Sequence, residues 1–254
     1  MEEVPSYQDV AAELRRRIDA GVYAVGEKIP TNPVLMREFG VSKETITKAT
    51  GLLADDGLVV ASKRAGTVVR NRTAVRLPLS RYRSVLAPGS PKGPWESATA
   101  AAGLNGEMLL IQVEPVRAPA DLAALLELSP DDPIVYRLRH AIIQPADLVQ
   151  IQMAWYPKAI AEAAGLHLSD KVQAGAYSAL AAAGYRPATA SETVEARTPT
   201  EAEAAALRIG GRVAVITVER VTRDTEGRPL EVLRAVAPAD RLRMTYDDLP
   251  LIES

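Results

Sequence analysis

The chain has 254 residues, enough for one or two domains that each bury a core. Hydrophobic residues make up 47% and charged residues 24%, which is ordinary for a globular protein. The absence of cysteine excludes disulfide scaffolds, thiol catalysis and thiolate metal sites. No apolar run approaches the ~20 residues that span a bilayer, and the start lacks signal-peptide features. We therefore expect a cytoplasmic protein with no membrane partner.

The charge of the chain is unevenly distributed, although its formal net value is only −2. Residues 1–72 carry 11 basic and 10 acidic side chains, whereas residues 43–72 carry six basic and three acidic ones. The positive charge is therefore local. A stretch of this kind is more often a solvated surface than a DNA-binding one, so charge alone does not decide between the two.

Residues 6–70 have the pattern of three helices followed by a β-hairpin. The first helix is predicted from Tyr7 to Ala20, because apolar residues recur there at four-residue spacing. The second helix is short and ends at Gly40, and the third begins after Ser42. A hairpin is predicted over residues 58–69.

The two shorter helices have the spacing of a helix-turn-helix. The third helix presents short polar and basic side chains, which suit base edges in the major groove, and the hairpin tip suits the negative potential of the minor groove. The candidate DNA-binding residues are Thr31, Ser42, Lys43, Glu44, Thr45, Thr47, Lys48, Lys63, Arg64 and Gly66. For Lys43, Lys48 and Arg64, phosphate contact without sequence specificity remains an equal alternative to base reading.

An internal repeat begins at about residue 101. Each copy consists of a strand, an alanine-rich helix and a β-hairpin. Pro119 and Pro199 lie 80 positions apart, and Pro157 and Pro238 lie 81 apart. The repeat predicts one α+β domain with pseudo-twofold symmetry.

The local amino-acid composition of the chain also predicts its domain boundaries. Residues 73–94 mix arginine with proline and glycine, and we expect a linker there. The N-terminal domain is accordingly predicted over residues 1–72 and the second domain over residues 95–254.

The N-terminal region resembles the GntR family of bacterial regulators. The resemblance rests on Ile29-Pro30-Thr31, Phe39-Gly40-Val41-Ser42-Lys43-Glu44-Thr45, Asp56-Gly57-Leu58 and Gly66-Thr67-Val68-Val69. The double repeat is similar to the UTRA effector domain of the HutC branch of that family. Together these resemblances imply a winged helix-turn-helix, followed by a chorismate-lyase-like antiparallel-sheet domain that dimerises and binds a small molecule.

The chain departs from the family pattern in its second helix. Asn32 and Pro33 stand where the family usually has an acidic residue and an arginine, and that arginine commonly reaches a base. We therefore expect an operator that differs from the one most common in the family.

The resemblance also implies an effector pocket formed by the two repeat hairpins and the loop before them. Family positions that hold sugar-phosphate groups correspond to His140, Ile142, Gln152, Tyr177, Glu231 and Ala237. The first two are commonly arginine in members that bind phosphorylated sugars, so isoleucine and a neutral histidine argue against such an effector. The candidate effector-binding residues are Trp95, His140, Gln152, Tyr177, Glu231 and Arg234.

Several of these residues admit a structural role instead. Trp95 could stack on a planar ligand or hold its own loop down as an apolar plug. Glu231 could meet a ligand amine or hydroxyl, or it could pair with Arg234. A structural role is the more expected one for His140, and Trp155 is expected in the core.

The sequence predicts no enzyme and no cofactor or metal. It has two histidines, and it lacks Gly-x-Ser-x-Gly, a phosphate loop and metal-ligand spacing. Chorismate lyase is an enzyme, but a shared fold does not confer activity.

We therefore expect a homodimeric repressor that binds double-stranded operator DNA, with its affinity modulated by a small-molecule effector. Two alternatives stay open. One is a ligand-binding protein whose winged helix serves only dimerisation, and the other is a regulator without any effector.

Overall fold

The computed structural model describes residues 4–62, 66–78, 93–170, 172 and 175–246. The chain divides into two compact units. The first unit comprises Met1–Thr73 and Thr198–Ala214, and the second comprises Ala74–Arg197 and Val215–Ser254. Residues 198–214 therefore group with the N-terminal unit, although the predicted boundaries place them in the second domain.

The first unit contains the three predicted N-terminal helices. They are α1 (Tyr7–Asp19), α2 (Asn32–Phe39) and α3 (Lys43–Asp55). Ser6 and Asp9 form a reciprocal capping box at the start of α1. Gly40 ends α2 in a left-handed conformation with φ of 64°, which a glycine adopts without steric cost, and the Ser42 side chain caps α3.

An antiparallel hairpin completes the winged helix. Strand β1 (Val59–Ser62) pairs with β2 (Gly66–Val69). The core of this part combines apolar side chains from all three helices and the hairpin, among them Val10, Leu14, Leu35, Ile46, Leu53 and Leu58. Helix α8 (Glu201–Leu207) also belongs to this unit.

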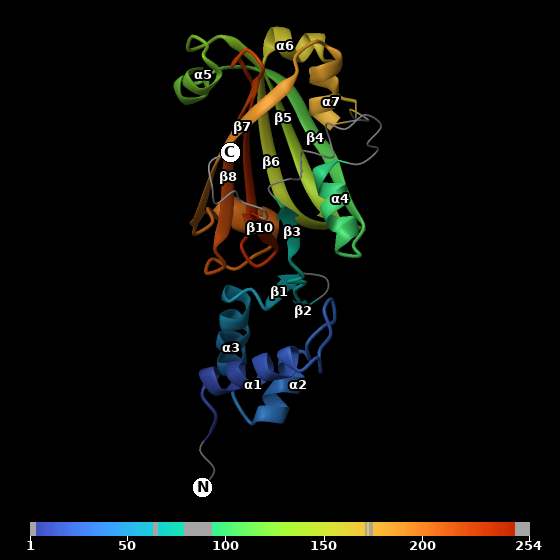
Figure 1. Ribbon diagram of the computed structural model, residues 1–254. Coiled ribbons are helices and arrows are strands. Elements are labelled where there is room, and N and C mark those ends of the chain that lie inside the picture. Colours follow the sequence, from blue (N-terminus) through green and yellow to red (C-terminus); the bar gives the residue numbers. More distant parts are fainter. Residues whose placement is uncertain (1–3, 63–65, 79–92, 171, 173–174, 247–254) are drawn as a thin grey trace, which may run out of the picture. The chain divides into compact units, whose positions relative to one another are not determined.

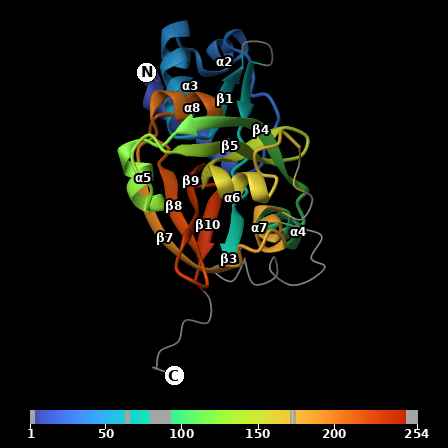
Figure 2. The ribbon, with the colours of Figure 1, turned by 90° about the horizontal axis from the view of Figure 1, so that it is seen from above.

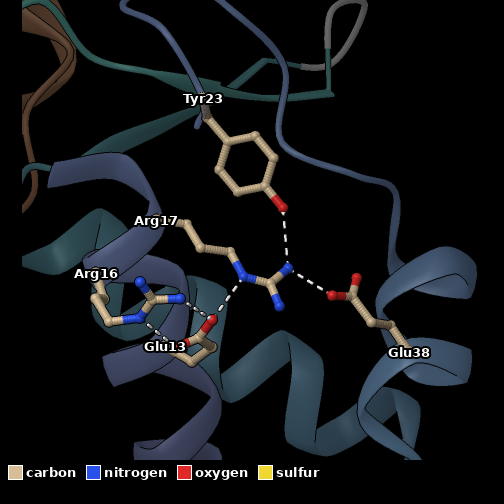
Figure 3. Close-up of polar contacts among 5 residues, drawn as sticks. All are labelled: Glu13, Arg16, Arg17, Tyr23 and Glu38. Atoms are coloured by element: carbon tan, nitrogen blue, oxygen red, sulfur yellow. Dashed lines mark hydrogen bonds and ion pairs between the residues drawn. The ribbon is translucent and has the colours of Figure 1, made fainter. Parts of the chain in front are cut away.

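A charged cluster ties α1 to α2 (Figure 3). Arg17 Nε donates to Glu13 Oε1 at 2.8 Å, and Arg17 Nη1 donates to Glu38 Oε1 at 2.5 Å. The same nitrogen donates to the Tyr23 hydroxyl at 3.3 Å. Hydrogen bonds from Arg16 and Arg17 lower the pKa of Glu13 to about 2. The cluster therefore adds electrostatic contacts to the apolar packing of the two helices.

The second unit is built on a six-stranded sheet in which every neighbouring pair is antiparallel (Figure 1). In spatial order the strands are β4 (Gly106–Arg117), β5 (Pro133–Ile143), β6 (Asp147–Pro157), β9 (Pro229–Pro238), β8 (Val215–Asp224) and β7 (Pro187–Arg197). The first three strands belong to one sequence repeat and the last three to the other. The sheet thus places the repeats side by side.

The strand register confirms the pseudo-twofold repeat. Arg139 pairs with Gln152 in the first hairpin, and Arg220 pairs with Leu233 in the second. Each residue of the second pair therefore lies 81 positions after its counterpart in the first pair. At the centre of the sheet, Met153 pairs with its own repeat counterpart across the β6–β9 boundary. Helix α5 (Ala120–Leu126) follows β4 as α8 follows β7.

Three helices cover one face of the sheet. They are α4 (Pro94–Ala101), α6 (Lys158–Ala163) and α7 (Gly175–Ala182). Helices α6 and α7 share one hydrophobic cluster with side chains of this face, and Figure 2 shows α4 on the same side of the sheet as α7. Helix α5 packs in a different cluster, with Ile134, Val221 and Val232.

The segment predicted as a linker contains a strand. Strand β3 (Val75–Pro78) pairs in parallel with β10 (Leu242–Thr245). Val75 and Leu77 are buried and alternate with an exposed Arg76, the period-two pattern of a half-buried strand. The surrounding arginines and prolines conceal this short pattern in the sequence. No helix in the described ranges is long and apolar enough to cross a membrane.

Candidate nucleic-acid interface and ligand cavity

Helix α3 separates buried from exposed side chains along its length. Ile46, Ala49 and Leu53 are buried in the core of the first unit. On the other side of the helix, Lys43, Glu44, Thr47 and Lys48 are exposed, together with the cap residue Ser42. This arrangement follows the helical period and leaves the predicted DNA-binding face open to solvent.

Local contacts already engage several of these polar groups. Lys48 Nζ lies 2.8 Å from Glu44 Oε1, and this hydrogen bond raises the pKa of Lys48. The Thr47 hydroxyl donates to the carbonyl of Lys43 at 2.9 Å. Lys43 has no ion pair with any described residue. A phosphate would therefore compete with Glu44 for Lys48, but it would meet Lys43 without such competition.

The remaining candidates for DNA contact lie in other elements. Thr31 is the exposed N-cap residue of α2, without a side-chain capping bond, and Thr45 donates its backbone N–H to Ser42 Oγ at 3.2 Å. Gly66 is exposed at the start of β2. Lys63 and Arg64 lie outside the described residues.

The second unit has a solvent-accessible cavity of about 550 Å³ between its sheet and the helices α4 and α7. This volume lies within the ~300–1,000 Å³ typical of small-molecule sites. Apolar side chains such as Leu104, Met108 and Leu166 line part of it. The sheet contributes a group of polar side chains, among them Arg137, Arg139, Gln150, Gln152, Arg220 and Glu231.

A buried carboxylate lies at the centre of this polar group. Glu231 is 1% exposed, and its Oε2 lies 2.9 Å from Arg220 Nη2. The Tyr156 hydroxyl donates to Glu231 Oε1 at 2.5 Å. Burial acts to raise the pKa of Glu231, but the charges of Arg220 and Arg139 and the hydrogen bonds outweigh it, so the pKa is lowered. Glu231 is therefore held as a carboxylate.

Two further arginines face the cavity from β5. Arg137 donates to the backbone carbonyls of Leu166, Leu168 and Asp170, and burial lowers its pKa. Arg139 Nη2 lies 4.0 Å from Glu231 Oε1, and its buried Nε has no hydrogen-bond partner among the described residues. The positive charges of these two arginines are therefore balanced only in part. Arg137 meets backbone carbonyls, and Arg139 shares the Glu231 carboxylate with Arg220.

Two known protein families match most of the chain. Residues 101–243 match the UTRA domain, and residues 6–69 match the model of bacterial regulatory proteins of the gntR family. The chain belongs to the GntR family. It is a DNA-binding transcriptional regulator with a ligand-binding UTRA domain, the arrangement of the HutC branch, and its relatives are regulators rather than enzymes.

Individual relatives align along most of their length. An uncharacterized HTH-type regulator of Rhizobium meliloti is 27% identical over 246 residues, which cover 96% of this chain and 95% of the relative. The HTH-type transcriptional repressor PhnF of Mycolicibacterium smegmatis is 25% identical over 239 residues, covering 94% and 91%.

Solved structures agree with the fold. A crystal structure of a GntR-family transcriptional regulator superposes with a TM-score of 0.60 at 25% identity, covering 98% of both chains. The crystal structure of PhnF from Mycobacterium smegmatis gives 0.58 at 24% identity, covering 93% of this chain and 97% of the other.

In this GntR regulator, four of the six predicted effector-binding residues line the cavity: Trp95, Gln152, Tyr177 and Glu231. Trp95 also has the structural role that the sequence offered as an alternative, in which its apolar side chain is packed inside the protein. It is 3% exposed, packs in a hydrophobic cluster, and donates from Nε1 to the carbonyl of Ile142 at 2.9 Å.

His140 and Arg234 are not among the residues that line the cavity. Burial lowers the pKa of the His140 imidazole. Arg234 pairs with Glu219 and Asp121, each at 2.8 Å, and not with Glu231. The reason is the strand period: Glu231 and Arg234 are three positions apart on β9, and their side chains point to opposite faces of the sheet.

Among the polar residues that line the cavity, sequence reasoning missed Glu96, Asn105, Arg137, Arg139, Gln150 and Arg220. On this strand the family resemblance pointed to the positions of His140 and Ile142 instead, of which only His140 was a candidate, and both positions alternate with the two β5 arginines. A register shift in the hairpin, where Ala141 pairs with Gln150 and Ile142 with Leu148, further changes the phase of the neighbouring strand β6. The recurrence of Arg139 and Arg220 at a spacing of 81 was the signal that could have identified them.

Proposed function

We propose that this regulator is a homodimeric repressor that acts in the cytoplasm on double-stranded operator DNA and responds to a small-molecule effector in the cavity of its second unit. The observation that carries the effector part is the cavity itself. It has the volume of a small-molecule site, and its apolar wall surrounds a few converging polar groups.

Helix α3 supports the DNA-binding part. Its exposed face offers Ser42, Lys43, Thr47 and Lys48. Short polar and basic side chains at the start of a recognition helix reach base edges and phosphates in a major groove. In a dimer, two such helices would read half-sites about 34 Å apart.

Repression is supported by one relative, since PhnF of Mycolicibacterium smegmatis is named a transcriptional repressor. The effector would act by favouring one arrangement of the dimer. Coupling of this kind is typically worth about 1–3 kcal/mol, or roughly 5- to 150-fold in operator affinity.

A reporter assay tests the proposal in cells. The DNA upstream of the regulator's own coding sequence is fused to a reporter in a host that lacks the protein. We expect the wild-type chain to lower reporter expression and the Lys43→Ala/Lys48→Ala variant to lose this effect. The control is Gln112→Ala, at an exposed position on β4. Equal expression with all three proteins, at equal protein levels, would contradict operator-dependent repression.

Sedimentation of the purified chain tests the dimer. We expect a mass twice that of the 27.2 kDa chain. A monomeric protein that still represses the reporter would contradict the dimer and would leave the proposed DNA binding intact.

A further inference from the structure

The loop that follows α8 packs against the C-terminal end of helix α3, inside the first unit. This α8 loop comprises residues 209–213, which group with the N-terminal helices although the UTRA match extends over them. Gly210 lies directly on the last turn of α3. A methyl group added at Gly210 would overlap the carbonyl oxygen of Ala54 and lie 2.5 Å from the Cα of Asp55. The two backbones therefore approach more closely than any residue with a Cβ would permit.

Two further contacts extend this packing to the turn after α3. Val213 is 8% exposed, and its Cγ2 lies against Gly57, where an added methyl group would be 2.5 Å from it. Arg212 Nη1 lies 3.8 Å from Asp56 Oδ1, and Arg15 Nη2 lies 2.5 Å from the other oxygen of that carboxylate. The α8 loop thus contacts both the end of α3 and the turn that leads into β1.

The first repeat has a different loop at the equivalent place. The 81-residue offset of the repeats relates Gly210 to Ser129 and Arg212 to Asp131. The Cβ of a serine in place of Gly210 would overlap the backbone of α3. An aspartate in place of Arg212 would set a second negative charge beside the carboxylate that Arg212 now approaches. The residues that make this contact are therefore specific to the second repeat.

The α8 loop is continuous with a strand that lines the ligand cavity. Strand β8 begins at Val215, two residues after Val213, and carries Arg220 of the cavity wall. Helix α8, on the other side of the loop, follows β7 directly in the chain. A backbone-on-backbone contact has little room to adjust, because packed interiors leave few voids. A shift of these strands would therefore be passed to the end of α3.

We propose that the α8 loop is the coupling contact of this regulator: it holds the winged helix to the strands β7 and β8 and thereby sets the spacing of the two winged helices in a dimer. The loop docks at the C-terminal end of α3, whereas the proposed DNA contacts Ser42, Lys43 and Lys48 lie at its N-terminal end. Docking and DNA binding are thus compatible. The inference rests on the proposed function and adds the element that would transmit the effector state.

A fixed contact affects DNA binding because a dimer binds two half-sites at once. Once one half-site is bound, the second binds at an effective concentration that depends on how well its position matches the protein. Inserting two base pairs between the half-sites moves them apart by about 7 Å and rotates one against the other by about 70°. A docked α8 loop should make this mismatch costly, whereas a released loop should make it tolerable.

Two neighbouring glycines provide the test and its matched control. Gly210→Ala introduces the methyl group that overlaps α3, whereas a methyl group added at Gly211 meets nothing within 4 Å. Neither glycine has a positive φ, so backbone strain does not separate the two substitutions. Val213→Ala is a second, milder variant, which removes the methyl groups that contact Gly57 and creates no overlap.

The probe is the duplex upstream of the regulator's own coding sequence, in which footprinting locates the half-sites, and a version with two base pairs inserted between them. We expect the wild type and Gly211→Ala to prefer the native spacing by at least about tenfold, and Gly210→Ala by less than about threefold. Val213→Ala should lie between them. A duplex with a single half-site should bind all four proteins within about twofold, because the DNA-contacting face is unchanged.

The outcomes separate this inference from the proposed function. A wild-type spacing preference in Gly210→Ala, or an equal loss in Gly211→Ala, would overturn the coupling contact and leave operator binding intact. If Gly210→Ala fails to bind the single half-site, its winged helix is misfolded and Val213→Ala decides. An unchanged spacing preference in Val213→Ala then overturns the inference. A wild type that binds no duplex specifically would overturn the proposed function and the coupling contact with it.

Discussion

Arg220 and Glu231 form an ion pair of 2.9 Å inside the second unit, with side chains only 5% and 1% exposed. The pair lies on the neighbouring strands β8 and β9, and Tyr156 completes it from β6 by donating to the second carboxylate oxygen. Removing one member of such a pair leaves the other charge buried and uncompensated. The pair is thus both part of the cavity wall and a point on which the stability of the unit depends.

Glu231→Gln should therefore lower the free energy of unfolding of the second unit by about 3–5 kcal/mol. Urea unfolding followed by tryptophan fluorescence measures this. The matched control is the triple variant Glu192→Gln/Arg220→Met/Glu231→Leu, which also removes the carboxylate 3.6 Å from Arg220 and should lose less than the single variant. A single variant within 1 kcal/mol of the wild type would show that the pair is not buried as described.

The same carboxylate predicts a pH dependence. Because the pKa of Glu231 in the folded state is lowered below the ordinary value of 4.5, its charged form stabilises the fold above that value. This contribution is lost as the pH falls from 4.5 through the folded-state pKa. Stability measured by tryptophan fluorescence should decline in this window for the wild type, and the decline should be shallower for Glu231→Gln. Identical slopes would assign the acid sensitivity to other groups.

In the first unit, Arg17 should matter more than its neighbour Arg16. Arg17 contacts Glu13, Glu38 and Tyr23, whereas Arg16 contacts Glu13 alone and is largely exposed. Arg17→Met should destabilise the packing of α1 on α2 by about 1–2 kcal/mol, and Arg16→Met should have a much smaller effect. Amide hydrogen exchange in the two helices measures both. Equal acceleration by both variants would contradict the bridging role of Arg17.

Glu44 and Lys48 should have opposite effects on DNA binding. Lys48→Ala removes a cation and should weaken operator binding, with a salt slope smaller by about 1. Glu44→Gln removes the 2.8 Å partner of Lys48 and an anion from the same face, so it should strengthen binding to unrelated duplexes. Titrations at several salt concentrations give both slopes. Unchanged slopes in both variants would place α3 away from the DNA backbone.

Much of the fold was predictable because local signals agree with one another. The end of α2 at Gly40, the start of α3 after Ser42 and the 81-residue repeat all agree with what the sequence suggested. These features depend on short-range hydrogen bonds and on periodicity, which a single sequence displays directly.

The wall of the cavity was harder to predict because it depends on which face of a strand each residue occupies. His140 and Arg139 are adjacent in the sequence, yet only Arg139 lines the cavity. A one-residue error reverses the face, and the register shift opposite Ala141 alters the phase of the neighbouring strand β6, which carries Gln150 and Gln152. The partner of Glu231 was also not evident, since Arg220 reaches it across strands and Arg234, closer in sequence, lies on the opposite face.

Fluorescence anisotropy of the purified regulator tests the central claim most directly. The protein is titrated onto the duplex upstream of its own coding sequence and onto a scrambled duplex, at two salt concentrations. A DNA-reading regulator should bind the native duplex more tightly, and this preference should survive at the higher salt. Equal binding to both duplexes that disappears at the higher salt would indicate phosphate contacts alone and would contradict recognition of an operator at this site.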